Sequence, residues 1–273
     1  MKERLLILMV FMRILKDRNF KNGKDKIIFL GTAGGRFSVF YQIRKSGGIW
    51  FHLGGKIFVI DPGPGALVTA LKNKINMSKV DGIFLSHRHL DHCADINSIM
   101  ESMVISGKRT RYLFAPSAAL DEDPVVLHYN RDKFNILYLK EYTDYAIGDL
   151  KISTKLTHLH TTPTFGAVFK SDSYSFAYIA DTLYTDQLAI DYRADVVIVN
   201  TVFKNQMPGY MHLSANDMYK FLEIFKPKIL ILTHFGMGFL NESPHLVAKE
   251  ISQKTNTNVI AAWDNMIVEL ENI

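Results

Sequence analysis

The chain alternates short apolar runs with amphipathic stretches, and Gly, Pro or polar residues close each run. Apolar runs of about four to eight residues between such breakers are typical of buried strands. They predict strands at residues 27–30, 49–53, 56–60, 82–85, 112–115, 150–159, 167–170, 175–179, 196–199, 229–232, 259–262 and 267–270. Amphipathic stretches predict helices at residues 66–75, 94–104, 215–225 and 244–253. Because both halves contain strands and helices, we expect two packed sheets with helices outside them.

Two segments fit no regular element. The Gly-rich loop at residues 31–35 lacks the spacing of a phosphate-binding loop, and no helix is evident after it. We interpret it as a tight passage of the backbone beside a site. Residues 121–144 hold one apolar run, at 136–139, and we expect this region to shape access to that site.

The domain organisation is simple, because no Pro-, Gly- or Ser-rich linker and no internal repeat divides the 273 residues. We expect a single domain over residues 27–273 and an N-terminal extension over residues 1–26. The extension carries an apolar run at 5–15 that is too short to cross a bilayer, and no small-residue cleavage site follows it. Three interpretations remain: a surface helix, a weak contact with a membrane surface, or a start codon upstream of true initiation at Met9 or Met12. We favour the first and third over the second and expect no stable membrane span.

The formal net charge of +5 and the isoelectric point near 9.1 are mildly basic. This charge density is below that of a dedicated nucleic-acid binder, but it is compatible with an anionic substrate. The single cysteine, Cys93, excludes an intramolecular disulfide and fits the reducing cytoplasm, where we expect the protein to reside. We expect Cys93 to be a small buried residue at the start of a helix.

Four potential metal ligands lie within six residues, directly after the predicted strand at 82–85. Two histidines two positions apart on an extended chain project to the same side, and Asp91 and His92 follow on the next turn. One segment could therefore serve two metal ions, with His87 and His89 on one and Asp91 and His92 on the other. The alternative, a polar loop with a chance excess of histidine, is weaker because three of the ten histidines fall within these six positions.

Three further candidates, His160, Asp181 and His234, each follow a predicted strand, where rigid backbone fixes geometry. We prefer His160 to His158, whose side chain is expected to pack on the apolar side of its strand. Asp181 could cap a helix or bridge two cations. Together with the first segment these residues give five imidazoles and two carboxylates, a set that suits Zn²⁺ best, with Mn²⁺ or Fe²⁺ as alternatives.

His212 lies on a loop before the predicted helix at 215–225, for which Ser214 is a plausible N-cap. A histidine there could donate a proton or stabilise an oxyanion, and a plain surface histidine is an equally open alternative. We expect the remaining three histidines to be structural: His52, His128 and His245.

Over residues 27–270 these motifs resemble the metallo-β-lactamase superfamily. The segment His87-X-His89-X-Asp91-His92 carries the most specific likeness, and the later ligands match in order and spacing. Asp61, followed by Pro and Gly, resembles the family's first aspartate, which usually supports the metal loop. The resemblance implies an α/β fold, a four-layer αββα sandwich, with the site at one edge of its two sheets.

The resemblance also implies which residues share a metal ion. One ion would be held by His87, His89 and His160, and the second by Asp91, His92 and His234. Asp181 would bridge the two.

Within the superfamily, the local sequence is similar to the tRNase Z-like phosphodiesterases. Residues 160–166 resemble their His-Ser-X-Pro-Ser/Thr-X-Gly segment, residues 31–34 resemble their opening loop, and His212-Leu-Ser resembles their leaving-group histidine motif. Two features depart from tRNase Z. The long Gly/Pro-rich arm that holds tRNA has no counterpart, and the His212 motif differs from the usual form, which favours smaller phosphodiesters, including cyclic ones.

We therefore expect a dinuclear metal-dependent hydrolase, foremost a phosphodiesterase that uses a hydroxide shared by two cations, with Asp91 and His212 as catalytic residues. A carbonyl hydrolase of the lactonase or thioesterase type on the same site is the first alternative, and tRNase Z-like RNA processing is the second. A non-catalytic binding protein is disfavoured by the full set of ligands. The expected partner is a small anionic substrate rather than nucleic acid, and analogy with the family also allows a homodimer.

Overall fold

The computed structural model describes residues 24–105 and 109–273. The N-terminal extension predicted over residues 1–26 therefore lies almost entirely outside the described residues. Within these ranges no helix is long and apolar enough to cross a membrane.

The described strands are β1 (Lys26–Phe29), β2 (Ile49–Leu53), β3 (Lys56–Ile60), β4 (Gly82–Phe84), β5 (Tyr112–Ala115), β6 (Asn135–Tyr138), β7 (Asp144–Ile147), β8 (Leu150–Thr154), β9 (Ala167–Lys170), β10 (Ser175–Ile179), β11 (Val196–Phe203), β12 (Leu213–Ser214), β13 (Ile229–Thr233), β14 (Val259–Ala261) and β15 (Met266–Glu269). The described helices are α2 (Gly35–Tyr41), α3 (Ala66–Lys72), α4 (Leu90–Cys93), α5 (Ile96–Val104), α6 (His128–Arg131), α7 (Asp186–Asp191), α8 (Asp217–Ile224), α9 (Met237–Asn241) and α10 (Pro244–Thr255). Short helical turns lie at η1 (Met77–Lys79), η2 (Ala118–Glu122) and η3 (Leu270–Asn272).

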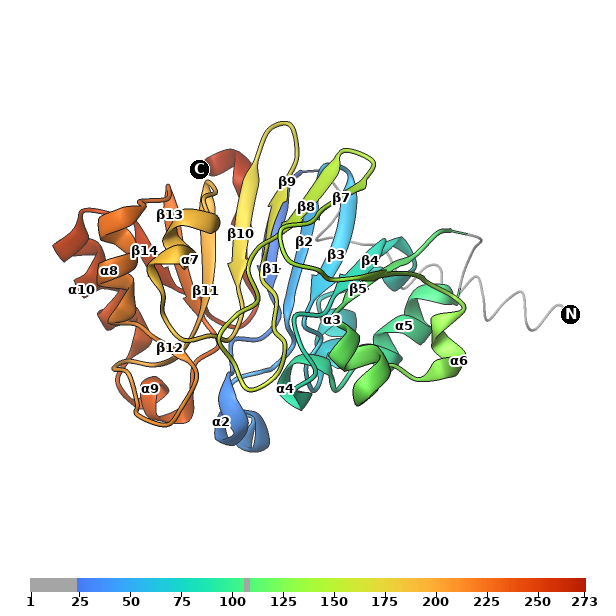
Figure 1. The fold of residues 1–273 in the computed structure, drawn as a ribbon, viewed down its shortest axis with the longest axis horizontal. Helices are drawn as coiled ribbons and strands as arrows, with labels where there is room; N and C mark the ends of the chain where they lie inside the picture. The colour runs from blue at the N-terminus through green and yellow to red at the C-terminus, as the bar shows by residue number, and fades with distance from the viewer. Residues whose placement is uncertain (1–23, 106–108) are drawn as a thin grey trace, which may run out of the picture.

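The strands form two mixed sheets that pack face to face (Figure 1). One sheet has the order β15-β1-β2-β3-β4-β5-β6, and the other has the order β14-β13-β11-β10-β9-β8-β7 with β12 paired to β11. Helices α3 and α5 pack on the outer face of the first sheet, and α7, α8 and α10 pack on the outer face of the second. The predicted four-layer αββα sandwich is confirmed.

Alternation of side chains along each strand separates the interior into layers. In β3, Phe58 faces the core between the sheets, whereas Val59 faces the helices. The central core is rich in phenylalanine, and the rings of Phe51 and Phe169, from opposite sheets, lie 5.0 Å apart. Because both faces of each sheet are covered, the strands read as nearly continuous apolar runs in the sequence.

Parallel strands end at the same edge of a sheet, and this places distant segments of the chain side by side. Strands β10, β11 and β13 are parallel, and so are β3, β4 and β5. The two sheets are joined at this edge where Phe165 N donates to Ser86 O at 3.1 Å. Figure 1 shows α2, α4 and α9 along the same edge. The segments that follow β4, β10 and β13 therefore lie close together.

The expectation that no helix follows the Gly-rich loop is wrong, because α2 begins at Gly35. This helix has only seven residues, too few for a clear periodic pattern. Ser38 Oγ on α2 donates to Phe235 O at 3.1 Å, a contact with a segment far along the chain. Local sequence does not encode such a contact.

The strand predicted at 150–159 is too long, since β8 ends at Thr154. Beyond it, His158 N donates to Thr164 O at 2.9 Å and Leu159 N donates to Thr182 Oγ1 at 3.1 Å. These backbone groups bond within the loop and to the loop after β10, so they do not extend the sheet.

The prediction that Ser214 is the N-cap of a helix at 215–225 is wrong. Ser214 lies in β12, and its N and Oγ atoms both donate to Asp217 Oδ2, at 2.8 and 2.9 Å. Helix α8 accordingly begins at Asp217. The unassigned region 121–144 holds α6 and β6 and ends at the start of β7.

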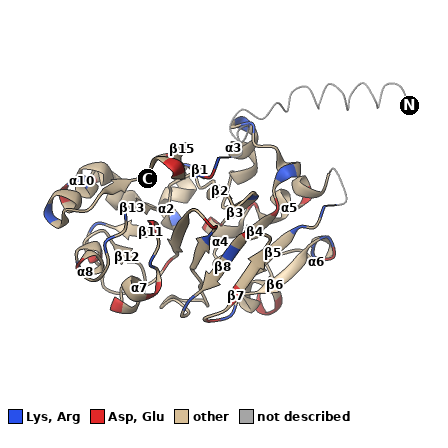
Figure 2. Cartoon of the chain, turned by 90° about the horizontal axis from the view of Figure 1, so that it is seen from above, with Lys and Arg blue, Asp and Glu red and all other residues tan. Residues whose placement is uncertain are grey.

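Charged side chains are spread over the described part of the chain. Figure 2 shows Lys and Arg on several helices, strands and loops of both halves, interspersed with Asp and Glu. This distribution agrees with the mildly basic composition and differs from the concentrated basic stripe typical of a nucleic-acid binder.

Candidate metal centre

The first cluster at the sheet edge is formed by three histidines. His87 Nε2 lies 3.0 Å from His89 Nδ1, and His160 Nε2 lies 3.2 Å from the same atom. His87 and His89 come from the segment after β4, and His160 comes from the loop between β8 and β9. Three imidazole nitrogens at such short separations are arranged as donors around one point.

The second cluster combines two histidines with two carboxylates. His234 Nε2 lies 3.5 Å from Asp91 Oδ2, and His92 Nε2 lies 3.7 Å from it. Asp181 contributes both oxygens, with Oδ1 3.5 Å from His234 Nε2 and Oδ2 3.5 Å from His92 Nε2. Asp181 also groups with His87 and His92, so it lies between the two clusters. The structure thus brings together all seven predicted ligand residues, whose role as ligands stays a prediction.

The hydrogen bonds behind the rings determine which imidazole nitrogen faces each cluster. His92 Nδ1 lies 2.9 Å from Asp61 Oδ2, and His160 Nδ1 lies 2.8 Å from Met211 O. Carboxylate and carbonyl oxygens only accept, so Nδ1 carries the proton in both rings. In the neutral ring Nε2 then has a free lone pair directed at the cluster, the arrangement that metal-binding histidines require.

Asp61 supports this arrangement from behind. Its carboxylate accepts from Ser86 N at 2.7 Å, Ser86 Oγ at 2.6 Å, His92 Nδ1 at 2.9 Å and Tyr178 OH at 2.7 Å. Because Ser86 Oγ donates its proton to Asp61, it can accept a hydrogen bond from His87 Nδ1, which lies 2.9 Å away. Asp61 therefore orients one histidine of each cluster.

Two buried ring nitrogens without hydrogen-bond partners indicate that the second cluster can accept a cation. Nε2 of His92 and Nε2 of His234 are buried and have no hydrogen-bond partner. An unpaired buried polar atom is costly, and native structures rarely leave one without a reason. Imidazole nitrogens next to carboxylate oxygens are the donor set of Zn²⁺ and related divalent ions. The residues present fit such a cation.

Electrostatics keeps the first cluster neutral. Burial lowers the pKa of His87 well below its ordinary value, and the neighbouring His92 lowers it further. Burial also lowers the pKa values of His89 and His160. Neutral imidazole is the form that binds metal ions, so this cluster is already in the binding state near neutral pH.

The second cluster is held as ion pairs in the metal-free chain. Burial lowers the pKa of His234, but the carboxylates of Asp181 and Asp91 together outweigh it and raise that pKa to about 9. Burial also opposes the charged form of His92, yet Asp91 and Asp181 raise its pKa well above the ordinary value. Burial would raise the pKa of Asp181, whereas His234 and His92 hold it well below its usual range. Protonated histidines thus supply the positive charge that stabilises these carboxylates in the metal-free chain. A bound divalent cation would supply the same positive charge.

His212 lies beside the centre, and its predicted catalytic role stays a prediction. Its Nδ1 is 3.3 Å from Asp181 Oδ2, and its ring centroid is 5.0 Å from that of His160. The short strand β12 directly after it pairs with β11 and fixes the approach of this loop. His212 can therefore reach a group held at the clusters from the side of Asp181.

Among the described residues, His158 and Cys93 belong to none of the metal-type groups. His158 is buried and its Nε2 contacts Tyr192 OH at 2.8 Å, and burial lowers its pKa to about 4, so it packs as a neutral ring. Cys93 is buried as expected, and burial raises the pKa of its thiol to about 12. Within the described residues, three other histidines belong to no metal-type group: His52, His128 and His245.

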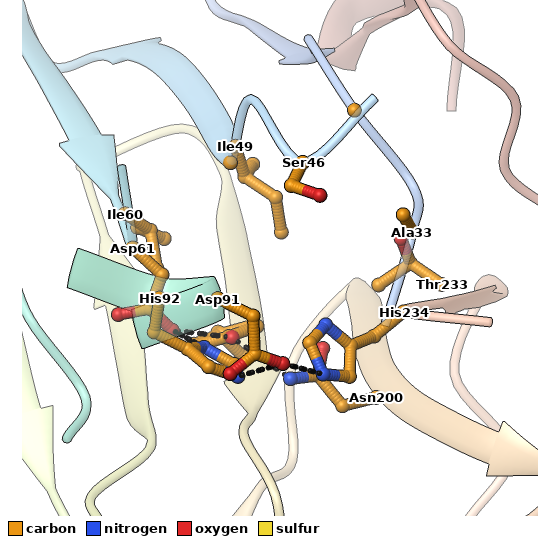
Figure 3. Close-up of a pocket in the computed structure, with 13 residues that line it drawn as sticks. Ala33, Ser46, Ile49, Ile60, Asp61, Asp91, His92, Asn200, Thr233 and His234 are labelled. Carbon is orange, nitrogen blue, oxygen red and sulfur yellow. Dashed lines mark hydrogen bonds and ion pairs between the residues drawn. The ribbon is translucent and has the colours of Figure 1, made fainter. Parts of the chain in front are cut away.

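A small cavity of about 30 Å³ lies behind the second cluster (Figure 3). Asp91, His92, His234 and Asn200 lie on one side of it and Ser46 on the other. Asn200 and Tyr178 also line the cavity, and neither was predicted from the sequence. The sequence did offer a signal, because each residue places a polar group within a mostly apolar strand. Burying such a group is costly unless it has a hydrogen-bond partner.

Comparison with known proteins places the chain in a family. The family model of the Beta-lactamase superfamily domain matches residues 56–235. The uncharacterized protein MJ1374 of Methanocaldococcus jannaschii is 31% identical over 256 residues, which cover 90% of this chain and 96% of that protein. Ribonuclease Z of Saccharolobus islandicus is 23% identical, over 84% of this chain and 95% of that protein. The solved structure of YhfI, a metallo-β-lactamase fold protein from Bacillus subtilis, gives a TM-score of 0.76 at 20% identity, and the match covers 90% of this chain and 99% of that one.

The matched residues extend from β3 to just beyond β13, and so include both clusters and His212. The chain belongs to the metallo-β-lactamase superfamily, whose members are metal-dependent hydrolases. The predicted family is therefore confirmed, and a centre for divalent metal ions agrees with both the family and the cluster geometry.

Proposed function

We propose that the protein is a dinuclear metal-dependent phosphodiesterase. The observation that carries this proposal is the place of Asp181, whose ligand atom groups with His87 and His92 while its two oxygens lie 3.5 Å from His234 and His92. A carboxylate shared by two donor sets is what a pair of cations needs. The first cation would be held by His87, His89 and His160, and the second by Asp91, His92 and His234.

When bound, a pair of divalent cations would lower the pKa of a coordinated water and neutralise charge on phosphate oxygens. The residues of the chain supply position and proton transfer. Asp91 would hold the second cation beside the attacking water, together with His92 and His234, whose Nε2 atoms lie 3.7 and 3.5 Å from its Oδ2. His212 would hold a proton on the leaving-group side, next to Asp181, and pass it to the departing oxygen. The donor set favours Zn²⁺, with Mn²⁺ or Fe²⁺ as alternatives.

Phosphodiester chemistry is favoured over carbonyl chemistry by the likeness of the His212 motif and of residues 160–166 to the tRNase Z-like phosphodiesterases. A nearby proton donor would assist an alkoxide leaving group in either chemistry. The relationship to Ribonuclease Z points the same way, since RNA is a polymer of phosphodiesters. Small diesters are favoured over tRNA. Among the loops made wholly of described residues, the longest lies between β8 and β9. This loop carries His160 into the centre, so it is not available as an extended arm that could hold tRNA.

A panel of substrates tests this proposal. The protein loaded with Zn²⁺, and separately with Mn²⁺, is assayed with bis(p-nitrophenyl) phosphate, a cyclic nucleotide, a simple lactone and a thioester. We expect turnover of the diesters that exceeds turnover of the lactone and the thioester by at least about tenfold, a difference of roughly 1.4 kcal/mol in the barrier. The reverse preference would favour the lactonase or thioesterase alternative. A precursor tRNA is assayed beside this panel, and activity on it alone would favour RNA processing.

A further inference from the structure

A single amide interrupts the most apolar strand of the second sheet. Strand β11 begins with four aliphatic residues and then carries Asn200, whose exposed fraction is 2%. A primary amide buried in a sheet core needs partners for its two N–H groups, or it is strongly destabilising. Asn200 therefore has a specific reason to be there.

The partners of Asn200 lead directly to the metal centre. Its Nδ2 donates to Asp181 Oδ1 at 2.8 Å and to Tyr178 OH at 3.1 Å. Tyr178 OH in turn donates to Asp61 Oδ2 at 2.7 Å, and Asp61 accepts from His92. The direction of each bond is fixed, because both carboxylates accept and the tyrosine has only one proton to give. A continuous chain of hydrogen bonds thus joins the shared carboxylate to the rear of the second cluster.

The hydrogen bond from Asn200 to Asp181 determines the direction in which each carboxylate oxygen of Asp181 points. Rotation of a carboxylate about its last bond is only weakly restricted by its own torsion. Asn200 holds Oδ1, and this leaves Oδ2 facing His92 and His212 at 3.5 and 3.3 Å. The amide is neutral, so it achieves this without adding a charge to a buried centre.

We propose that Asn200 is a positioning residue that holds Asp181 in the orientation shared by two cations, with Tyr178 bracing its amide from the other side. This inference rests on the proposed dinuclear centre. Asn200 would act through Asp181, the ligand residue to which its amide donates. Its removal should therefore weaken cation binding before it affects the rest of the fold.

The neighbouring residue offers a matched control. Thr201 is fully buried in the same strand, and its Oγ1 donates to Thr233 O at 3.2 Å without contacting a ligand residue. Thr201→Val removes one buried hydrogen bond, as Asn200→Leu removes those of the amide. A general effect on β11 would appear in both variants, whereas a loss of metal-site geometry would appear only in Asn200→Leu.

The test measures Zn²⁺ binding by competition with a chromophoric chelator, alongside the rise in Tm that Zn²⁺ causes. We expect Asn200→Leu to lose about 10- to 100-fold in affinity for one of two cations, with a smaller Zn²⁺-dependent rise in Tm. Thr201→Val should retain wild-type affinity. Wild-type affinity for both cations in Asn200→Leu would overturn the inference.

A second variant covers the case in which Asn200→Leu does not fold. Tyr178→Phe keeps the ring and removes the hydroxyl, which accepts from Asn200 and donates to Asp61 in the same chain of hydrogen bonds. We expect a several-fold loss of affinity for one cation, and unchanged affinity in this variant would overturn the inference. If the wild-type protein binds fewer than two cations, both the proposed dinuclear centre and this inference are contradicted. The wild-type measurement alone gives this result, so it is distinguishable from a failure of the inference only.

Discussion

Oδ2 of Asp61 lies 2.9 Å from Nδ1 of His92, and both side chains are almost completely buried. This contact fixes the proton of His92 on the side away from the ligand cluster. The same carboxylate holds Ser86, which contacts His87 in the other cluster. One aspartate outside the ligand sets therefore determines the ring orientation in both.

Replacing Asp61 should weaken the whole centre. In Asp61→Ala, His92 and Ser86 lose their acceptor, and a buried imidazole is left without a partner. We expect about 10- to 100-fold weaker Zn²⁺ binding, the usual effect of removing an outer hydrogen-bond partner of a ligand. Chelator competition measures this loss. Binding as tight as in the wild type would show that these rings are oriented by packing alone.

His212 is expected to act in proton transfer. His212→Ala should lower turnover of a diester by roughly 10²- to 10⁴-fold while the metal content stays unchanged. His245→Ala, on the exposed side of α10, is the matched control and should leave turnover unaffected. Unchanged turnover in His212→Ala would exclude the proposed role. Loss of one metal would instead make His212 a ligand, which its 3.3 Å distance from Asp181 permits.

The metal-free protein should become less stable as pH rises above neutrality. The carboxylates of Asp181 and Asp91 together raise the pKa of the buried His234 to about 9, against about 6.5 in an unfolded chain. Between these values the native state binds a proton that the unfolded state has released, so stability is complete below pH 6.5 and is lost as pH approaches 9. We expect a loss on the order of 1–3 kcal/mol, measured by urea unfolding in a chelator.

His234→Gln is the control for this pH dependence, since it cannot take up the proton. Its stability should change less between pH 6.5 and 8.5 than that of the wild type. Zn²⁺ binding should show the opposite trend, because the cation must displace the same proton and binds more tightly as pH rises. A wild-type stability that increases over this range would contradict the ion-pair description of the second cluster.

The sequence was most informative where backbone geometry is local. Strands β2 and β3 were predicted at their observed bounds, because a nearly continuous apolar run on each side of a pair of glycines suffices. Asp181 and His234 could be proposed as ligands because each follows a strand, and parallel strands end at one edge. His160 was also selected, although its strand ends at Thr154 and a loop carries it to the centre.

The features that escaped prediction depend on contacts between distant segments. Asn200 is recognisable only once Asp181 and Tyr178 are known to lie beside it, from two other places in the sheet. Helix α2 is held by a bond to Phe235, about two hundred residues later. His212 was a catalytic candidate from its motif, but it lies in the loop between β11 and β12 and does not directly follow a strand, so its contact with Asp181 could not be inferred from the local pattern.

The most direct test of the account is the number of metal ions per chain. The purified protein is dialysed against buffer with a fixed low concentration of free Zn²⁺, and bound metal is measured by mass spectrometry next to Asp181→Ala. We predict about two ions per wild-type chain, as a two-metal hydrolytic centre requires, and a clear reduction in the variant. A wild-type chain that retains one ion or none after reconstitution would contradict the dinuclear centre.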